Sequence, residues 1–236
     1  MKGVCLITYI VLRSEPSGKA EQLSQIIYGE TYQVLEQKDK WYRVKCDFDG
    51  YEGWISTAQF FSIEEKAKSQ FIVCNAFVPT KEIFLPAGAL VHEELKGTRS
   101  IASERGTVFD ICNLALQFMH TPYLWGGKTF MGIDCSGLVQ VVFKAFGYNL
   151  PRDAHQQVLH GEAVLLKDAH PGDLAFFENP EGKVTHTGII LGSDNIIHAH
   201  GWVRTDQLDE DGIYNSQRGI YTHKLHGIRR ILTNVI

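Results

Sequence analysis

The sequence lacks the paired cysteines that build zinc knuckles and disulfide frameworks. Its five cysteines are odd in number and widely spaced, and no C-x-x-C motif occurs. Neither a disulfide scaffold nor a structural zinc site is therefore indicated. This usage is typical of the reducing cytosol. Four of them lie in mixed apolar sequence and are expected to be small buried hydrophobic residues: Cys5, Cys46, Cys74 and Cys112.

Long hydrophobic runs and dense basic segments are also missing. No stretch approaches the roughly 20 apolar residues of a membrane-spanning helix. The apolar N-terminal segment is short, is interrupted by Thr8 and Tyr9, and precedes no small-residue cleavage site. The formal charge of -4 offers no general attraction for nucleic acid or anionic lipid. We therefore expect a cytoplasmic protein, monomeric, without a nucleic-acid or membrane partner, for which a small anionic substrate is still possible.

The first part of the chain, residues 1–65, contains short strand patterns separated by turn signals. Tyr32 and Val34, and then Trp41, Val44 and Cys46, are spaced by two residues or nearly so. Strands this short and close together predict a small β-barrel. The segment YGETYQVLEQKDKWYRVKCDFDGYEGWI resembles the bacterial SH3-like domains attached to cell-wall enzymes. Residues 66–103 hold two or three further strand patterns, either a degenerate second SH3-like unit or strands that complete the first.

From residue 104 the pattern changes to helices followed by strands. Helical periodicity predicts a helix over 107–120, and Pro122 lies just beyond it. The residues after Cys135 are apolar on almost every side, which predicts a buried central helix capped by Gly147. PGDLAFF, THTGIIL, NIIHAH and GIRRIL follow as strands. We expect an α+β domain over residues 104–236.

Cys135 lies at the point where a glycine-rich loop meets this apolar helix. The first turn of a helix presents unpaired N–H groups and the positive end of the dipole, both of which favour an anion. Asp134 is placed to cap the helix, and Ser136 and Gly137 are small enough to admit a substrate backbone. The position predicts a nucleophilic cysteine with a lowered pKa. The alternative is a fifth buried thiol.

A cysteine nucleophile needs a base, and two histidines on apolar strands are candidates. His186 and His198 share one face only if a three-residue loop joins their strands, with Asn195 in a left-handed conformation. His186 would then accept the thiol proton, and His198 would orient it as the third member of a triad. Alternatively, each histidine is a half-buried strand residue, and His200 is a second candidate for the orienting role.

The remaining histidines of the C-terminal half are expected at the surface: His155, His160, His170, His223 and His226. His198-x-His200 could suggest a metal, but no carboxylate cluster or second close histidine pair supports one. We expect no metal and no cofactor.

Five motifs in order resemble the NlpC family of papain-like bacterial cell-wall peptidases: TPYLWGGKTFMGIDCSGLV, LPRDAHQQ, PGDLAFF, THTGIILG and NIIHAHG. They cover roughly residues 104–236. Together with the SH3-like half, they resemble the cytoplasmic γ-D-glutamyl-L-diamino-acid endopeptidases that recycle murein peptides. The resemblance implies a papain-like C-terminal domain, with Cys135 as nucleophile, His186 as base and His198 as orienting residue.

The same resemblance implies the substrate-binding residues. Tyr123 lines the site and helps to stabilise the oxyanion; otherwise it is a packing aromatic. Asp134 and Ser136 contact substrate. Glu21 and Tyr51 of the SH3-like domain bind the free amino terminus of L-Ala, although Glu21 could equally be a solvated surface charge.

Two details of the resemblance bear on specificity. Trp125 is expected to be a packing residue. After Pro151-Arg152-Asp153, many relatives carry a serine that touches substrate, whereas this chain has Ala154. The D-Glu carboxylate would then be held by Ser136 and backbone amides, or more weakly.

Three functions remain at this point. The first is hydrolysis of the γ-D-glutamyl–diamino acid bond through a thioester, where the diamino acid is meso-diaminopimelate or L-Lys. The second is an amidase or acyltransferase of the same superfamily. The third is a non-catalytic module that binds cell wall.

Overall fold

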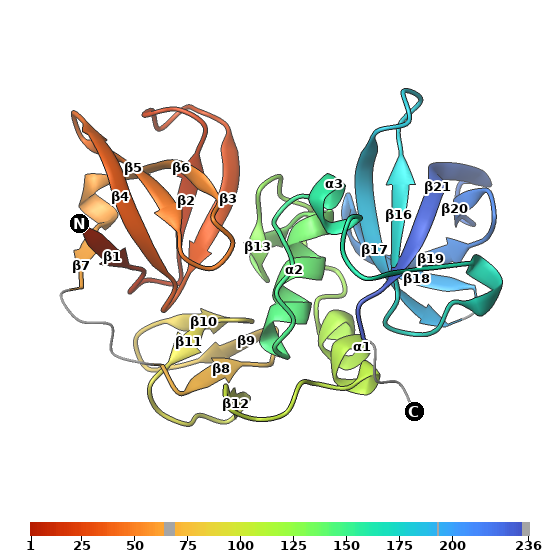
Figure 1. Ribbon diagram of the computed structural model, residues 1–236, viewed down its shortest axis with the longest axis horizontal. Helices are drawn as coiled ribbons and strands as arrows, with labels where there is room; N and C mark the ends of the chain where they lie inside the picture. The colour runs from red at the N-terminus through yellow and green to blue at the C-terminus, as the bar shows by residue number, and fades with distance from the viewer. Residues whose placement is uncertain (64–68, 193, 233–236) are drawn as a thin grey trace.

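The computed structural model describes residues 1–63, 69–192 and 194–232. Figure 1 shows a β-barrel at the N-terminal end and a larger sheet at the C-terminal end, with helices between them and small sheets below. None of the helices in these ranges is long and apolar enough to cross a membrane. The fold is the expected α+β arrangement of an SH3-like barrel followed by a papain-like unit.

The N-terminal barrel is an antiparallel sheet of seven strands in the order β3-β2-β6-β5-β4-β1-β7. Alternate residues of β2 and β6 point inward, and the enclosed core includes Ile10, Leu12, Val44 and Ile55. A short 3-10 helix, η1, spans Thr57–Gln59. The strands are β1 (Lys2–Val4), β2 (Tyr9–Arg13), β3 (Gln22–Ile27), β4 (Thr31–Lys38), β5 (Trp41–Cys46), β6 (Glu52–Ser56) and β7 (Phe61–Ser62).

The next segment forms two small sheets with a core of their own. β8 is the middle strand of a three-stranded sheet, and β9 and β10 form a hairpin. The strands are β8 (Phe71–Val73), β9 (Phe77–Pro79), β10 (Phe84–Pro86), β11 (Leu90–Val91) and β12 (Thr98–Ser100). The expected boundary after residue 65 lies outside the described residues, and the division into three domains stays a prediction.

The central helix α2 (Cys135–Ala145) is the element around which the C-terminal part packs, and every one of its residues is buried. The predicted 107–120 helix is α1 (Val108–Gln117), which begins with a capping box of Thr107 and Asp110. Gly147 follows α2 with a φ of 86°, as a helix-ending glycine requires. The remaining small elements here are β13 (Lys128–Thr129), β14 (Gly132–Ile133), α3 (Ala154–Gln157) and η2 (Leu166–Asp168).

A second seven-stranded antiparallel sheet completes the fold, in the order β15-β21-β16-β17-β18-β19-β20. β20 also pairs with β21, so the far strands curl back. The α2 helix packs on β17 and β18, and Figure 1 shows it between this sheet and the N-terminal barrel. The strands are β15 (Glu162–Val164), β16 (Leu174–Glu178), β17 (Val184–Gly192), β18 (Asn195–His200), β19 (Trp202–Leu208), β20 (Gly212–Asn215) and β21 (Ile220–Arg230).

The connection between β17 and β18 differs from the predicted three-residue loop. Asn195 is the first residue of β18 and pairs with Gly192, so its predicted left-handed conformation is wrong. A register shift between Ile190 and Gly192 supplies the extra residue as a bulge within β17. Gly188 then faces His198, and His186 shares that face. Ser193 itself lies outside the described residues.

A buried ion cluster fastens the barrel to the helix layer. The Glu30 carboxylate contacts the Lys144 ammonium at 2.5 Å and the Lys128 ammonium at 3.6 Å. All three side chains are at most 4% exposed. The same interface includes a hydrogen bond from the Lys128 N–H to the Gln25 side chain. The barrel is therefore held in a fixed position beside the start of α2.

Candidate active site

Cys135 is the first residue of α2, and the local backbone is built around that position. Asp134 is the N-cap and accepts a hydrogen bond from the Gly137 N–H at 2.7 Å. Gly137 packs against the preceding loop so closely that a Cβ there would lie 2.2 Å from the Gly127 carbonyl oxygen. The sequence Gly126-Gly127 with Asp134 and Gly137 therefore fixes where the helix, and hence the sulfur, begins.

A cavity of about 460 Å³ lies at this end of α2. Its walls come from the helix start, the preceding loop, the 151–155 segment, β17 and the N-terminal barrel. The lining residues are Leu23, Tyr51, Tyr123, Trp125, Asp134, Cys135, Ser136, Arg152, Asp153, Ala154, His155, Lys183, Val184 and Thr185. It is the cavity in which a substrate could reach the cysteine.

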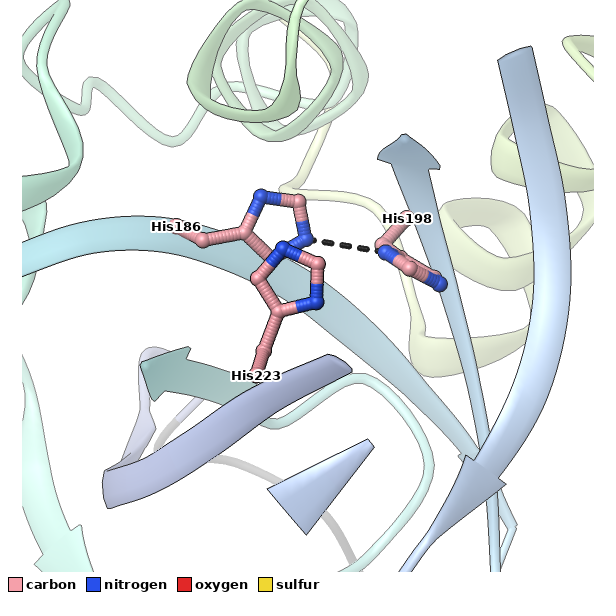
Figure 2. A group of neighbouring side chains, drawn as sticks. All are labelled: His186, His198 and His223. Atoms are coloured by element: carbon pink, nitrogen blue, oxygen red, sulfur yellow. Dashed lines mark hydrogen bonds between the residues drawn. The ribbon is translucent and has the colours of Figure 1, made fainter. Parts of the chain in front are cut away.

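The two predicted histidines lie together, and the residue that follows His186 contacts the cysteine. The N–H of Thr187, the neighbour of His186 on β17, donates to the Cys135 sulfur. His186 Nε2 lies 2.8 Å from His198 Nδ1. The other ring nitrogen of His186 points away from His198 (Figure 2). If that Nδ1 accepts the thiol proton, His186 must carry its own proton on Nε2 and donate it to His198.

Asp206 extends this chain of hydrogen bonds, and sequence reasoning missed it. His198 Nε2 lies 3.0 Å from Asp206 Oδ2, and Arg204 donates to Asp206 Oδ1 at 2.8 Å. Burial alone would raise the pKa of Asp206, but His198 and Arg204 hold it below its usual value. The carboxylate therefore stays charged and orients His198. The spacing of Arg204 and Asp206 by two on one strand was the only sequence signal.

The prediction that Cys135 is an anion with a lowered pKa is wrong. Burial, with a further contribution from Asp134, raises the pKa of Cys135 to about 12. Burial and the neighbouring histidines lower the pKa of His186 well below its usual value. Desolvation of the buried sulfur outweighs the backbone N–H groups of Thr187 and Ser136 and the charge of Arg152, which all act to lower the pKa. The resting pair is a neutral thiol and a neutral imidazole, so His186 is suited to general-base catalysis.

Asp134 is saturated by protein donors, which contradicts its expected role as a substrate acceptor. Besides the Gly137 N–H, the Asp134 carboxylate accepts a hydrogen bond from the Gly126 N–H at 2.8 Å. It also accepts from Arg152 Nη1 at 3.0 Å and from Arg152 Nη2 at 2.5 Å. Ser136 Oγ donates to it at 3.3 Å and accepts from Arg152 at 2.9 Å. A carboxylate offers about four lone-pair sites. Asp134 and Ser136 are therefore occupied in holding the loop, the helix start and the buried Arg152.

Tyr51 from the barrel reaches the cavity and contacts a carboxylate that sequence reasoning had not selected. Its hydroxyl donates to Asp153 Oδ2 at 3.2 Å. Burial, with Asp153 next, raises the pKa of Tyr51 to about 12, so the phenol stays protonated. Glu21 is exposed and does not line the cavity, whereas Leu23 of the same segment does. The structure thus offers Asp153 rather than Glu21 as Tyr51's acidic partner.

Four further aromatic and histidine side chains are placed by the structure. Tyr123 lines the cavity, and burial together with nearby Cys135 raises the pKa of its phenol. Trp125, expected to be a packing residue, is 60% exposed and lines the cavity. His223, expected at the surface, is half-buried and stacks on His186 with ring centroids 4.0 Å apart. His200 is exposed, and the ring nitrogen of His186 faces His198 instead.

With this geometry in view, comparisons with known proteins define the class. Residues 120–222 match the NlpC/P60 family, and residues 12–60 match the bacterial dipeptidyl-peptidase SH3 domain. The chain belongs to the NlpC/P60 family and is a cysteine peptidase.

Curated relatives match most of the length of the chain. The γ-D-glutamyl-L-lysine dipeptidyl-peptidase of Bacillus subtilis is 31% identical over 242 residues, which cover 88% of this chain and 80% of the relative. The protein of that name from Bacillus cereus is 25% identical and is matched over 75% of this chain and 66% of its own length. A solved NlpC/P60 protein from Bacillus cereus shares the fold, with a TM-score of 0.82 at 19% identity over 98% of this chain and all of that one.

Proposed function

We propose that the protein is a cysteine endopeptidase that cuts murein peptides between γ-D-glutamate and the following diamino acid. The observation that carries the proposal is the cavity itself. It holds the Cys135 thiol at the start of α2, and Tyr51 of the barrel and Asp153 meet in its wall. Two relatives that match 88% and 75% of this chain are named γ-D-glutamyl-L-lysine dipeptidyl-peptidases.

Asp153 and Tyr51 would define the amino-terminal end of the substrate. A carboxylate in a partly buried wall favours an ammonium group, and the phenol hydroxyl keeps the carboxylate oriented. The free amino group of L-Ala would sit there, and Leu23 and Tyr51 would leave no room for longer extensions. Peptides with a free amino terminus are released murein fragments, so we place the activity in the recycling of murein peptides in the cytoplasm.

The reaction would follow from the hydrogen-bond chain. His186 Nδ1 accepts the thiol proton as the Cys135 sulfur attacks the γ-carbonyl carbon of D-Glu, and the imidazolium is stabilised through His198 and Asp206. The tetrahedral intermediate collapses when His186 returns the proton to the departing amine of the diamino acid. Water, deprotonated by His186, then hydrolyses the thioester and restores the thiol.

The negative oxygen of the intermediate needs donors at the helix start. The Cys135 N–H lies in the first turn, where N–H groups have no intrahelical acceptor. The Tyr123 phenol lines the same cavity and stays protonated because its pKa is raised. These two donors form the proposed oxyanion hole.

Carboxylates of the substrate would meet positive charge elsewhere in the cavity. Ala154 is buried and has no hydroxyl to offer, and Ser136 is already bonded to Arg152 and Asp134. Lys183 and His155 also line the cavity and are exposed. We propose that these two side chains, rather than a serine, face the carboxylates of the peptide.

The test uses defined tripeptides and product analysis. Purified protein is incubated with L-Ala-γ-D-Glu-L-Lys and with the meso-diaminopimelate analogue, and free L-Ala-γ-D-Glu is measured. We expect cleavage at the γ-glutamyl bond, and an N-acetylated substrate should be cut about 10- to 100-fold more slowly because it loses a charged hydrogen bond. In Tyr51→Phe, the cleavage rates of the free and the N-acetylated substrate should differ by less than in the wild type.

Other results would redirect the proposal. Cleavage that is indifferent to N-acetylation would support the amidase or acyltransferase alternative. Failure to cleave any γ-D-glutamyl peptide would overturn the proposal.

A further inference from the structure

Three histidines from strands β17, β18 and β21 converge on one another. The available ring nitrogens of His186, His198 and His223 all lie within 4.8 Å of one another. Figure 2 shows the His186 and His223 rings stacked and the His198 ring approaching them edge-on. His186 and His198 are buried, and His223 is half-buried. Neutral imidazole nitrogens are the preferred protein ligands of zinc among nitrogen donors.

In His198 and His223, one ring nitrogen is hydrogen-bonded to a residue outside the cluster, and the other ring nitrogen is directed into the cluster. His198 Nε2 is bonded to Asp206, so its Nδ1 lone pair faces His186. His223 Nδ1 lies 2.9 Å from the Thr222 hydroxyl, which leaves Nε2 for a ligand. A histidine whose far nitrogen is bonded to a carboxylate is the usual arrangement of a zinc ligand. The cluster thus has both the donors and the outer support of a metal site.

We propose that this cluster binds Zn²⁺ and that bound zinc inhibits the peptidase. To coordinate through Nε2, His186 must give up the proton on that nitrogen and carry its single ring proton on Nδ1. Nδ1 is the nitrogen that the proposed mechanism requires free to accept the thiol proton. The metal therefore removes the general base without touching the sulfur, and the inhibited state reverses when zinc leaves.

Access to the cluster does not require the peptide cavity. His186, His198 and His223 do not line that cavity, whereas exposed His200 lies with its ring centroid 4.8 Å from that of His223. Zinc would enter from this side, past the half-buried His223 ring. Mg²⁺ and Ca²⁺ prefer oxygen ligands and should not compete.

Direct binding tests the site independently of the peptidase activity. ZnCl₂ is titrated by calorimetry into the full chain and into the variants Cys135→Ala, His223→Phe and His200→Phe, with MgCl₂ as the control. We expect one zinc per chain in the wild type, Cys135→Ala and His200→Phe, and at least about tenfold weaker binding in His223→Phe. His223→Cys, which restores a zinc ligand, should recover binding and shows that the position tolerates change.

Inhibition is measured with the same proteins on a γ-D-glutamyl peptide. Each protein's rate is compared with its own rate without zinc. The zinc concentration that halves this rate should be at least about tenfold higher in His223→Phe than in the wild type, and EDTA should restore the rate. The inhibitory effect rests on the proposed function, whereas the binding measurement does not. Loss of zinc binding in Cys135→Ala with retention in His223→Phe would overturn the proposal in favour of a cysteine–histidine site. Absence of binding in the wild type would overturn it outright.

Discussion

The buried ion cluster of Glu30, Lys128 and Lys144 gives the sharpest prediction for stability. Glu30 is 4% exposed, contacts both ammonium groups and also accepts the Ile27 N–H at 2.8 Å. Burial alone would raise the pKa of Glu30, but the two lysines lower it. Burial lowers the pKa of Lys144 even with Glu30 present. The Glu30→Gln substitution keeps the shape of the side chain and removes the only negative charge in these contacts.

The size of the effect follows from what the lysines must then do. Breaking a buried ion pair on one side costs about 3–5 kcal/mol. The cost has a ceiling, because each lysine can release its proton: with an ordinary pKa of about 10.4, neutralisation costs about 4.6 kcal/mol per lysine at pH 7 and about 1.9 kcal/mol per lysine at pH 9. We therefore expect Glu30→Gln to lower the free energy of unfolding by about 3–5 kcal/mol at pH 7 and by about 2–4 kcal/mol at pH 9, where one or both lysines become neutral.

Urea unfolding of wild type and variant at both pH values measures this difference. Glu52→Gln is the matched control, since Glu52 pairs with Arg43 at the surface at 2.9 Å and should contribute at most about 1 kcal/mol. A Glu30→Gln deficit below about 1 kcal/mol at pH 7, or one that does not shrink at pH 9, would refute the reasoning.

Two further predictions concern the hydrogen-bond chain. Asp206→Asn should lower kcat by about 10- to 100-fold with little change in KM. This effect is smaller than the ~10⁴-fold loss for a carboxylate bonded directly to the base, because Asp206 acts through His198. An unchanged kcat would remove Asp206 from the mechanism. Because the pKa of His186 is lowered, its neutral form persists as pH falls, so the acidic limb of kcat/KM should lie below pH 6.5. A limb above pH 6.5 would contradict a buried neutral base.

Sequence reasoning identified the residues whose chemistry is local. Cys135 was visible because a capping aspartate and two glycines surround it at a helix start. His186 and His198 were visible because they lie on two successive apolar strands. The prediction that both histidines lie on one face of the sheet was correct, but the predicted loop was not. The extra residue that brings them to one face lies in the bulge at residue 191 of β17, not in the loop. Bulges leave no sequence signature of their own here.

The residues that were missed depend on contacts distant in sequence. His223 lies near the end of the chain, and only the pairing of β21 with β16 brings it to His186. Arg152 was not selected from LPRDAHQQ, yet it is 1% exposed because Asp134, Ser136 and Ser24 surround its guanidinium. The pKa of Cys135 was predicted in the wrong direction because burial of the sulfur cannot be read from a helix cap.

Substrate contacts were the least predictable part of the site. Asp134 was chosen because it adjoins the cysteine, but the buried Arg152 already uses its charge. Asp153 follows that arginine in sequence and instead meets Tyr51 of the barrel. Which acidic residue faces the cavity is decided by the packing of two domains, which no local pattern encodes.

The central claim is that the Cys135 sulfur carries the reaction, and the direct test is kcat/KM of Cys135→Ala on L-Ala-γ-D-Glu-L-Lys. Cys112→Ala, which removes a partly buried thiol of α1, is the matched control. We predict a loss of about 10⁴- to 10⁶-fold for Cys135→Ala and near wild-type activity for Cys112→Ala. Activity of Cys135→Ala within tenfold of wild type would contradict the account.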